Sequence, residues 1–430
     1  MAAPESPEPL VLQGGSVPDV AVRTLSHVPW LDIPGVRAVV WALGRDQVRF
    51  VGGCVRDHLM GRTSLDVDIA TALPPDESLR RLKAANVRAK PIGIEHGTVV
   101  ALTSTGQFEI TTLRRDVETD GRHAKVAFTN DWVEDASRRD FTINALSVDP
   151  DGRLYDPCGG LNDIESGTVR FIGRPEDRIA EDVLRLLRFF RFSAWYARGR
   201  LDQAGLDAAA RLADRLDTLS GERLSAELRR LLSAPDPGEA VAAMAQHQIL
   251  RSLTALTIRS KILSRVVALE RSQGLEAAPI GRLAAMLPGP ADAYRALAER
   301  LRFSKVQTAN LIALARPLPE LGADARGIRQ ALYGIGDRQT YRLAALLAAA
   351  EGDAADIDLR LKVAAEWAWP KFPVSGLDLL ELGVKPGPHV GEILRLVQDW
   401  WRRNDFAPTR DQCLAAIQRS LSDNPDTASR

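Results

Sequence analysis

Apolar and polar positions follow strand-like spacing in parts of the first third of the chain and helical spacing in most of the rest. GTVVALTST, from Gly97, and GQFEITTLR, from Gly106, predict two strands around a turn. Another strand is expected at Val48 to Val51, and residues 75–85 have the pattern of a helix. Strands packed with helices before residue 150 predict an α+β fold: a small head with a mixed β-sheet, followed by an all-α remainder.

The other patterns predict helices. Ala21 to Leu43 is patterned as one or two short helices. EDVLRLLRFFRFSAWY, from Glu181, predicts an amphipathic helix, and SGERLSAELRRLL, from Ser220, predicts a helix with serine as its N-cap. A break at Pro235 to Gly238 precedes helix-patterned segments to about residue 350. We expect a flexible N-terminal tail, a head, a helical neck, a helical body and a helical tail, with boundaries 1–20, 21–175, 176–240, 241–350 and 351–430.

The composition is that of a globular protein without a general affinity for nucleic acid. The 430 residues include 45% hydrophobic and 26% charged residues. Lys plus Arg and Asp plus Glu each number 56, so any RNA-binding surface has to be a local patch. No apolar run approaches the length of a membrane span, the nearest being LAALLAAA from Leu343. No membrane association is therefore expected.

Cysteine usage and the N-terminal residues indicate a cytoplasmic protein. Cys54, Cys158 and Cys413 lack the spacing of paired or metal-binding cysteines, which argues against a disulfide framework or a structural zinc. The first residues contain acids and prolines, and no basic residue precedes Arg23. That composition argues against a signal or transit peptide.

The candidate chemistry lies between residues 50 and 70. In an extended strand Asp66 and Asp68 project from the same side, so two carboxylates converge on one point and can bind Mg²⁺, which prefers oxygen ligands. Gly52 and Gly53 lack Cβ atoms, so N–H groups of the following helix can approach a phosphate, and Arg56 would add a charged donor. A triphosphate site beside a metal site predicts nucleotidyl transfer. Taken alone, the Asp-x-Asp would more often be a solvated strand edge than a metal site.

The order Gly-Gly, Arg-Asp, Asp-x-Asp resembles the first motif of the class II tRNA nucleotidyltransferase and bacterial poly(A) polymerase family, within the polymerase-β superfamily. Four more segments resemble later motifs of that family in the same order, and the match is strong from Phe50 to Leu232. These segments are DASRRDFTINALSVD from Asp135, DPCGGLNDI from Asp156, EDVLRLLRFFRFSAWY from Glu181 and SGERLSAELRRLL from Ser220.

The resemblance implies a role for each matching position. Metal binding and catalysis would fall to Asp66 and Asp68, and base selection to the aspartate and arginine of the Glu-Asp-x-x-Arg motif, where they offer acceptors and a planar donor fork. Glu109 is either a third metal carboxylate or a surface residue. The nucleotide-binding residues implied are Gly53, Arg56, Arg139, Asp182, Arg185, Arg188 and Arg191.

Two further segments leave alternatives open. Leu113 to Thr129 is polar and charged, so it is either a solvated loop or the flexible loop of the family's CCA-adding members, whose presence weighs against an enzyme that adds only CC. The segment from Phe372 resembles a tail element whose glycines and prolines create either a helix N-terminus that meets an RNA phosphate or a structural corner. The adjacent Trp400 and Trp401 are expected to be packing residues.

The expected activity is template-independent addition of C, C and A to the 3′ end of tRNA from CTP and ATP, with Mg²⁺ as cofactor and release of pyrophosphate. A bacterial poly(A) polymerase shares the head and neck motifs and is the nearest alternative. A non-catalytic RNA-binding protein on the same fold is a more distant one. The expected partners are tRNA, CTP and ATP, without an obligate protein partner.

Overall fold

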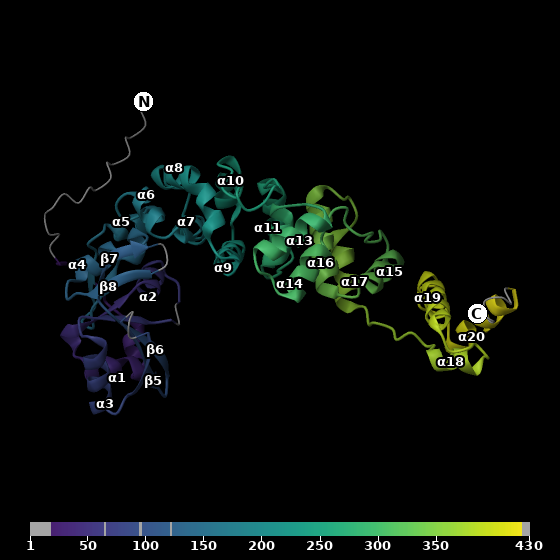
Figure 1. Cartoon of the computed structure of the whole chain (residues 1–430), viewed down its shortest axis with the longest axis horizontal. Helices are drawn as coiled ribbons and strands as arrows, with labels where there is room; N and C mark the ends of the chain where they lie inside the picture. Colours follow the sequence, from purple (N-terminus) through teal and green to yellow (C-terminus); the bar gives the residue numbers. More distant parts are fainter. Residues whose placement is uncertain (1–18, 64–65, 94–96, 121–122, 424–430) are drawn as a thin grey trace. The chain divides into compact units, whose positions relative to one another are not determined.

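The computed structural model describes residues 19–63, 66–93, 97–120 and 123–423, and it divides the chain into two compact units (Figure 1). The first unit comprises Met1–Lys261 with Glu299–Phe303, and the second comprises Ile262–Ala298 with Ser304–Arg430. The first unit includes α10 (Gly238–Gln246), so the division between the units does not coincide with the predicted boundary at residue 240. The boundaries predicted within each unit remain predictions.

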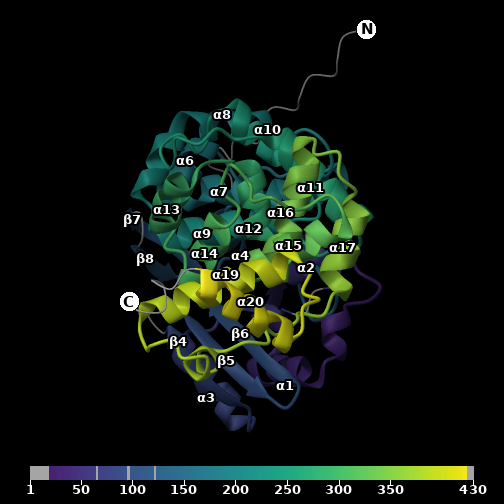
Figure 2. The ribbon, with the colours of Figure 1, turned by 90° about the vertical axis from the view of Figure 1, so that its right-hand side faces the viewer.

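The first unit is built on an eight-stranded mixed sheet with the strand order β1-β10-β9-β2-β3-β6-β5-β4. Only β3 and β6 run parallel, while the other neighbouring pairs are antiparallel, and β4, β5 and β6 lie side by side (Figure 2). The strand bounds are β1 Ala21–Thr24, β2 Val48–Val51, β3 Asp68–Thr71, β4 Arg88–Gly93, β5 Thr98–Thr103, β6 Gly106–Thr112, β9 Ser147–Val148 and β10 Arg153–Tyr155.

The core of this sheet follows from its apolar strand positions. All four residues of β2 are buried, and Phe50 of β2 pairs across the sheet with Ile69 of β3. Helices α1 (Pro34–Leu43) and α3 (Pro75–Ala84) pack on each other, and α3 also contacts β4 and β5. The strands predicted at β2, β5 and β6 and the helix predicted at residues 75–85 are therefore confirmed.

The N-terminal prediction was partly wrong. Residues 21–24 form the edge strand β1 instead of a helix, because β10 supplies a backbone partner that is distant in the sequence. Only residues 1–18 of the predicted flexible tail lie outside the described part of the chain. Asp19 is described, and its carboxylate accepts hydrogen bonds of 2.8 and 2.6 Å from the Arg49 guanidinium on β2.

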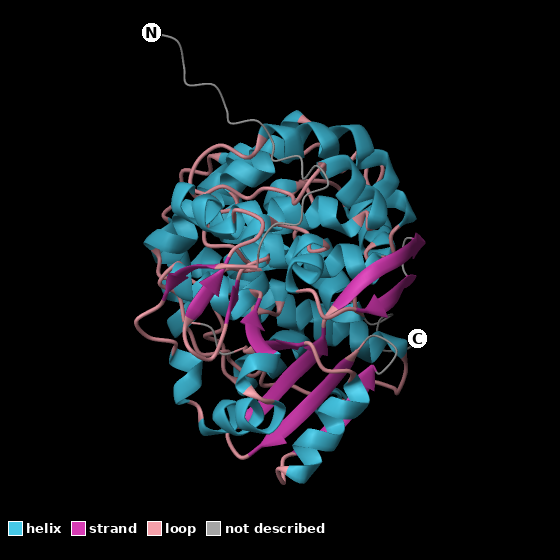
Figure 3. Ribbon diagram, turned by 90° about the vertical axis from the view of Figure 1, so that its left-hand side faces the viewer, coloured by secondary structure: helices cyan, strands magenta, loops and turns pink. Residues whose placement is uncertain are grey.

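The predicted loop at residues 113–129 was also wrong for most of its length. It forms an antiparallel hairpin of β7 (Arg114–Asp120) and β8 (His123–Phe128), which is separate from the large sheet (Figure 3). The charged composition of the segment did not indicate strands, because backbone hydrogen bonds hold the hairpin together. Residues 121–122, which belong to the segment predicted as a loop, lie outside the described residues.

Helices complete the first unit and carry the neck segment. The predicted helix from Glu181 is interrupted, because Asp182 has an extended backbone (φ −149°, ψ 108°) and ends one helix just before the next begins. A cluster of phenylalanines, Phe141, Phe171, Phe189 and Phe192, packs the second of these helices against the sheet domain. The helices are α2 Gly53–Leu59, α4 Trp132–Ser137, α5 Gly160–Ser166, α6 Pro175–Glu181, α7 Leu184–Tyr196, α8 Gln203–Leu212 and α9 Gly221–Leu232.

The second unit is helical throughout its described residues. Ser304 forms a capping box with Gln307 at the start of α14. Near the C-terminus α18, α19 and α20 pack together (Figure 1). Trp401 is almost fully buried and Trp400 packs against the same core, so both are packing residues as predicted. The helices are α11 Ser260–Ser272, α12 Pro279–Met286, α13 Ala291–Arg300, α14 Lys305–Ile312, α15 Ala325–Ile335, α16 Arg338–Glu351, α17 Ile357–Glu366, α18 Gly376–Glu381, α19 Pro388–Arg403 and α20 Arg410–Asp423.

Membrane-spanning helices are missing from the described residues. None of their helices combines the length and the apolar character that crossing a bilayer requires.

The glycine turn before α5 makes a close backbone contact that we expect to be essential for stability. A Cβ atom on Gly160 would lie 2.2 Å from the Thr142 carbonyl oxygen and 2.7 Å from its carbonyl carbon. Gly160→Ala should therefore lower the free energy of unfolding by about 1–3 kcal/mol, measured by equilibrium urea unfolding. Gly391→Ala in α19 is the control, because it meets no atom within 4 Å and should keep or raise stability. Equal stability of Gly160→Ala and the parent protein would contradict this account.

Candidate active site

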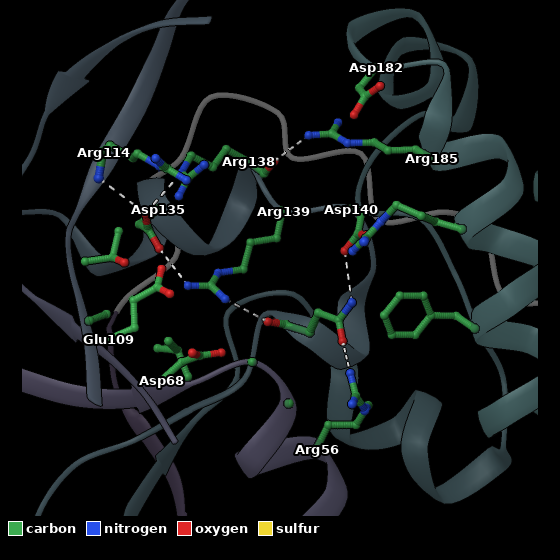
Figure 4. Close-up of a pocket in the computed structure, with 18 of the residues that line it drawn as sticks. Arg56, Asp68, Glu109, Arg114, Asp135, Arg138, Arg139, Asp140, Asp182 and Arg185 are labelled. Atoms are coloured by element: carbon green, nitrogen blue, oxygen red, sulfur yellow. Dashed lines mark hydrogen bonds and ion pairs between the residues drawn. The ribbon is translucent and has the colours of Figure 1, made fainter. Parts of the chain in front are cut away.

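The described residues form a pocket of about 550 Å³ in the first unit, between the sheet and the helices α7 and α9 (Figure 4). Carboxylates enter it from the sheet, and arginines enter it from both the sheet domain and the neck. The charged and amide residues that line it are Arg56, Asp68, Glu109, Arg114, Asp135, Arg138, Arg139, Asp140, Asn144, Asp182, Arg185, Arg188 and Arg223. Of the predicted nucleotide-binding residues, all except Arg191 line this pocket.

The floor of the pocket carries crowded carboxylates. Asp68 is the first residue of β3, and its register partner on the parallel strand β6 is Glu109. Asp66 lies just before β3 and is exposed, Val67 is buried and Asp68 is half-buried, and the common side expected for the two aspartates stays a prediction. Burial and the nearby charges of Asp66 and Glu109 raise the pKa of Asp68 to about 6. Asp66 itself is not among the residues that line the pocket.

These carboxylates fit a divalent cation that takes its remaining ligands from a bound substrate. Carboxylate oxygens are the ligands that hard cations prefer, and a positive ion would relieve the repulsion around Asp68. Among the described residues no cluster of three or more His, Cys, Asp or Glu side chains forms a preorganised metal site. The ion would therefore need phosphate oxygens to complete its coordination. Glu109 faces the pocket beside Asp68, which favours the metal interpretation over a plain surface residue.

A glycine allows the backbone to pass between a carboxylate and a guanidinium. Gly52 has φ +71°, and a Cβ atom there would lie 3.6 Å from Asp68 Oδ2 and 3.7 Å from Arg139 Nη1. Arg139 donates to Asp135 Oδ2 (3.1 Å) and to the Asn144 carbonyl oxygen (3.3 Å). Burial alone would raise the pKa of Asp135, but its two arginine partners outweigh burial and hold that pKa below its usual range. Arg139 is thus fixed above the floor carboxylates.

Arg56 lines the pocket but is bound to protein groups on every nitrogen. Its Nε donates to Asp57 Oδ1 (3.0 Å), its Nη1 to Asn144 Oδ1 (2.6 Å) and its Nη2 to the Tyr196 hydroxyl (2.7 Å). The guanidinium also lies over the Tyr196 ring, 4.1 Å from the centroid. A phosphate contact by Arg56 would have to share or replace one of these bonds, and in this structure Arg56 joins α2 to α7.

The same hydrogen-bond chain continues to Arg188. Asn144 Nδ2 donates to Asp140 Oδ1 (2.9 Å), and Arg188 Nε on α7 donates to Asp140 Oδ2 (2.7 Å). Burial favours the neutral form of Asp140, yet Arg188 and Asn144 more than offset it and lower its pKa. Figure 4 shows this chain running from Arg56 along the pocket wall. It connects the head segment to the neck helix through charged groups.

The predicted base-selecting pair lies on the opposite side of the pocket from Asp68 (Figure 4). Arg185 Nη1 contacts the Glu181 carboxylate and the Arg178 carbonyl oxygen (3.2 Å), while its Nη2 donates to the Arg138 carbonyl oxygen (3.3 Å). Both carboxylate oxygens of Asp182 accept from Arg223 Nη2, at 2.9 and 2.8 Å. Sequence reasoning missed Arg223, because it belongs to α9 and only the folded chain brings it to Asp182.

Arg191 is not among the residues that line the pocket, and its predicted role in nucleotide binding stays a prediction. Successive i+3 positions on a helix turn by about 60° relative to one another, so Arg191 has rotated by about 120° from Arg185. Its Nε donates instead to Glu227 Oε2 of α9 (2.6 Å), and both side chains are largely buried. Burial lowers the pKa of Arg191 although Glu227 acts in the opposite direction. Arg191 therefore joins α7 to α9.

The crowded carboxylates predict a stability gain when one charge is removed. The pKa of Asp68 is about 6 in the folded protein against an ordinary 3.8, so the folded state binds this proton more tightly than the unfolded chain. Stability contributed by the protonated form is therefore lost as the pH rises through about 6, by about 1–3 kcal/mol.

Asp68→Asn should accordingly melt at a higher temperature than the parent protein at pH 7.5 in a chelator. The gain should shrink toward pH 4.5, where the folded parent is already protonated at this position. Thermal unfolding followed by circular dichroism measures both. A variant that melts at or below the parent temperature at pH 7.5 would contradict the crowding.

Comparison with known proteins agrees with this geometry. Residues 48–170 match the family described as the poly A polymerase head domain, and residues 200–255 match the family described as the probable RNA and SrmB-binding site of polymerase A. The chain is 34% identical over 394 residues to CCA tRNA nucleotidyltransferase 1, mitochondrial, of Danio rerio, covering 89% of this chain and 90% of that protein. The human protein of the same name is 32% identical and covers 87% of each chain.

The fold matches as well. A crystal structure of the Bacillus stearothermophilus CCA-adding enzyme in complex with CTP superimposes with a TM-score of 0.70 at 25% identity, covering 91% of this chain and 99% of that one. Sequence similarity that extends through both units, together with this fold, establishes the relationship. The chain belongs to the class II CCA-adding enzyme and poly(A) polymerase family of nucleotidyltransferases.

Proposed function

We propose that this protein adds C, C and A to the 3′ end of tRNA from CTP and ATP without a nucleic-acid template. The observation that carries the proposal is a single pocket in which Asp68 and Glu109 lie across from Asp182 and Arg185. Such a pocket offers a cation and phosphate site on one side and a polar base site on the other. The similar vertebrate proteins named CCA tRNA nucleotidyltransferase support the choice of substrates.

The chemical step is an in-line displacement at the α-phosphorus of the nucleotide. The terminal 3′-oxygen of the RNA forms a bond to phosphorus, the bond to the β-phosphate oxygen breaks, and pyrophosphate leaves as the hydroxyl proton is lost. The family depends on divalent metal ions in general, and we propose Mg²⁺ here. When bound, Mg²⁺ would neutralise developing charge on the attacking and leaving oxygens. Asp66 and Asp68 would hold it, with Glu109 as an additional carboxylate.

The chain's own groups position the triphosphate. Arg139 is held over the floor carboxylates by Asp135, so its guanidinium edge can bind phosphate without first being ordered. Gly53 leaves the backbone of α2 open to close approach. Arg56 and Arg188 contribute through the chain of hydrogen bonds that connects α2 with α7, which keeps the phosphate site and the base site at a fixed distance.

Asp182 and Arg185 would select the base. Cytosine and adenine each present an amino donor next to a ring-nitrogen acceptor, which matches a carboxylate beside a guanidinium. Uracil and guanine present a carbonyl oxygen next to an N–H group. Their carbonyl oxygen would face the Asp182 carboxylate, acceptor against acceptor, and their N–H group would face the Arg185 guanidinium, donor against donor. Each unpaired polar group costs about 1–3 kcal/mol, which is enough to favour C and A.

Two further assignments complete the proposal. The helical segment from residue 351 to 430 would bind tRNA, and α19, which starts at Pro388, provides one helix N-terminus for a phosphate. The three cysteines are free thiols, which suits a cytoplasmic protein. The similar vertebrate proteins carry "mitochondrial" in their names, so imaging of the tagged full-length chain is the test of compartment.

The decisive assay uses tRNA that lacks its CCA end. CTP alone should extend the RNA by two residues, and CTP with ATP should add CCA and then stop. Because residues 48–170 match the poly A polymerase head domain, poly(A) synthesis is the second candidate. A product that ignores CTP and grows as a long A tract would replace the proposed activity with that one.

Removal of the floor carboxylates tests the catalytic assignment. Asp66→Ala and Asp68→Ala should each lower kcat by about a thousandfold or more, because the charge on the reacting phosphate would no longer be balanced. The control is Asp76→Ala, an exposed aspartate in the first turn of α3. Retention of activity in either floor variant, with circular dichroism showing an intact fold, would refute its role in binding the metal.

A further inference from the structure

The carboxylate of Asp182 is held by the Leu184 amide and by one side chain, Arg223. Asp182 lies in the break between α6 and α7, where no regular helix restrains it. The Leu184 amide donates to Oδ1 at 3.1 Å, whereas Oδ2 has a single recorded donor among the described residues, Arg223 Nη2 at 2.8 Å. The same nitrogen lies 2.9 Å from Oδ1. Arg223 Nη2 therefore contacts both oxygens and holds the direction in which the carboxylate points.

Arg223 is carried by a firmly anchored helix. It lies in the first turn of α9, and the start of this helix packs so closely that a Cβ on Gly221 would lie 2.3 Å from the Arg300 carbonyl oxygen. Leu224 and Leu228 are buried on the same helix, and Glu227 binds Arg191 of α7. A side chain on this platform can hold Asp182 at a fixed angle. Sequence alone gave no indication of such a contact.

Arg223 also belongs to the pocket itself. Its side chain is 30% exposed, equal to that of Asp182, and both residues line the cavity. Arg185, the donor half of the base-selecting pair, is held separately by Arg178, Glu181 and Arg138. The acceptor half therefore has its own support, and the two halves can be tested independently.

We propose that Arg223 is a specificity-determining positioning residue for the base site. The inference rests on the proposed function, and it deepens that function by naming the residue that orients the Asp182 carboxylate. With Arg223 in place, Asp182 keeps a free lone pair directed at the amino group of cytosine or adenine. Without it, the carboxylate rotates about χ1 and χ2, and its alignment no longer favours an amino group over a carbonyl oxygen.

The test is discrimination between nucleotides, because loss of a purely structural contact would lower kcat/KM for all four nucleotides in parallel. We would measure kcat/KM for CTP and UTP on tRNA lacking CCA, and for ATP and GTP on tRNA ending in CC. Arg223→Ala should reduce the CTP-over-UTP and ATP-over-GTP ratios by about tenfold or more. Arg223→Lys should recover part of each ratio, since a lysine ammonium keeps the charge and is also a single nitrogen that can contact both oxygens, but its flexible stem holds that nitrogen less firmly than the planar guanidinium.

Arg229→Ala is the matched control, because Arg229 is an exposed arginine of α9 that does not line the pocket. Its ratios should equal those of the parent. Melting temperatures exclude unfolding, and Arg223→Gln, which is close in size, serves if the alanine variant is unstable. Unchanged ratios in Arg223→Ala or Arg223→Gln, or a parallel loss for all four nucleotides, would overturn the inference. Failure of the parent protein to add C and A would instead overturn the proposed function.

Discussion

The structure depends on the placement of like charges on two neighbouring parallel strands, at the first residue of β3 and within β6. Asp68 and Glu109 are register partners, Asp66 adds a third negative charge, and the pKa of Asp68 rises in response. A protein without a cation to bind would gain stability by removing one of these groups. In the proposed function, phosphates and a metal ion would complete the charge balance in this arginine-lined pocket.

Arginine–carboxylate contacts connect this floor to the rest of the pocket. Arg139 is held by Asp135, Arg188 by Asp140, and Arg191 by the buried Glu227. Such pairs add little net stability when buried, but removing one partner leaves an uncompensated charge and is costly. These ion pairs therefore hold the sheet, α7 and α9 in a fixed arrangement around the pocket. In the proposed function, little reorganisation would then be needed when a nucleotide binds.

Local patterns were sufficient to find Asp68 and the pair Asp182 and Arg185, but not the groups that hold these residues in place. Alternation predicted the common side of Asp66 and Asp68, and the order of motifs identified most of the pocket. Long-range contacts were not predictable: β1 forms because β10 is available, and Arg223 is visible only where α9 meets Asp182. The contact of Arg191 with Glu227 was likewise not predicted, because it joins α7 to α9. Each contact that was not predicted joins residues that are distant in the sequence.

The central claim is that one pocket binds the metal and triphosphate at Asp68 and reads the base at Asp182 and Arg185. The most direct measurement is a crystal structure of the full chain with Mg²⁺, an unreactive CTP analogue and a tRNA lacking its CCA end. The account predicts that the ion contacts the Asp68 carboxylate and that the amino group of cytosine faces Asp182. A triphosphate bound away from Asp68, or a base turned away from Asp182 and Arg185, would contradict it.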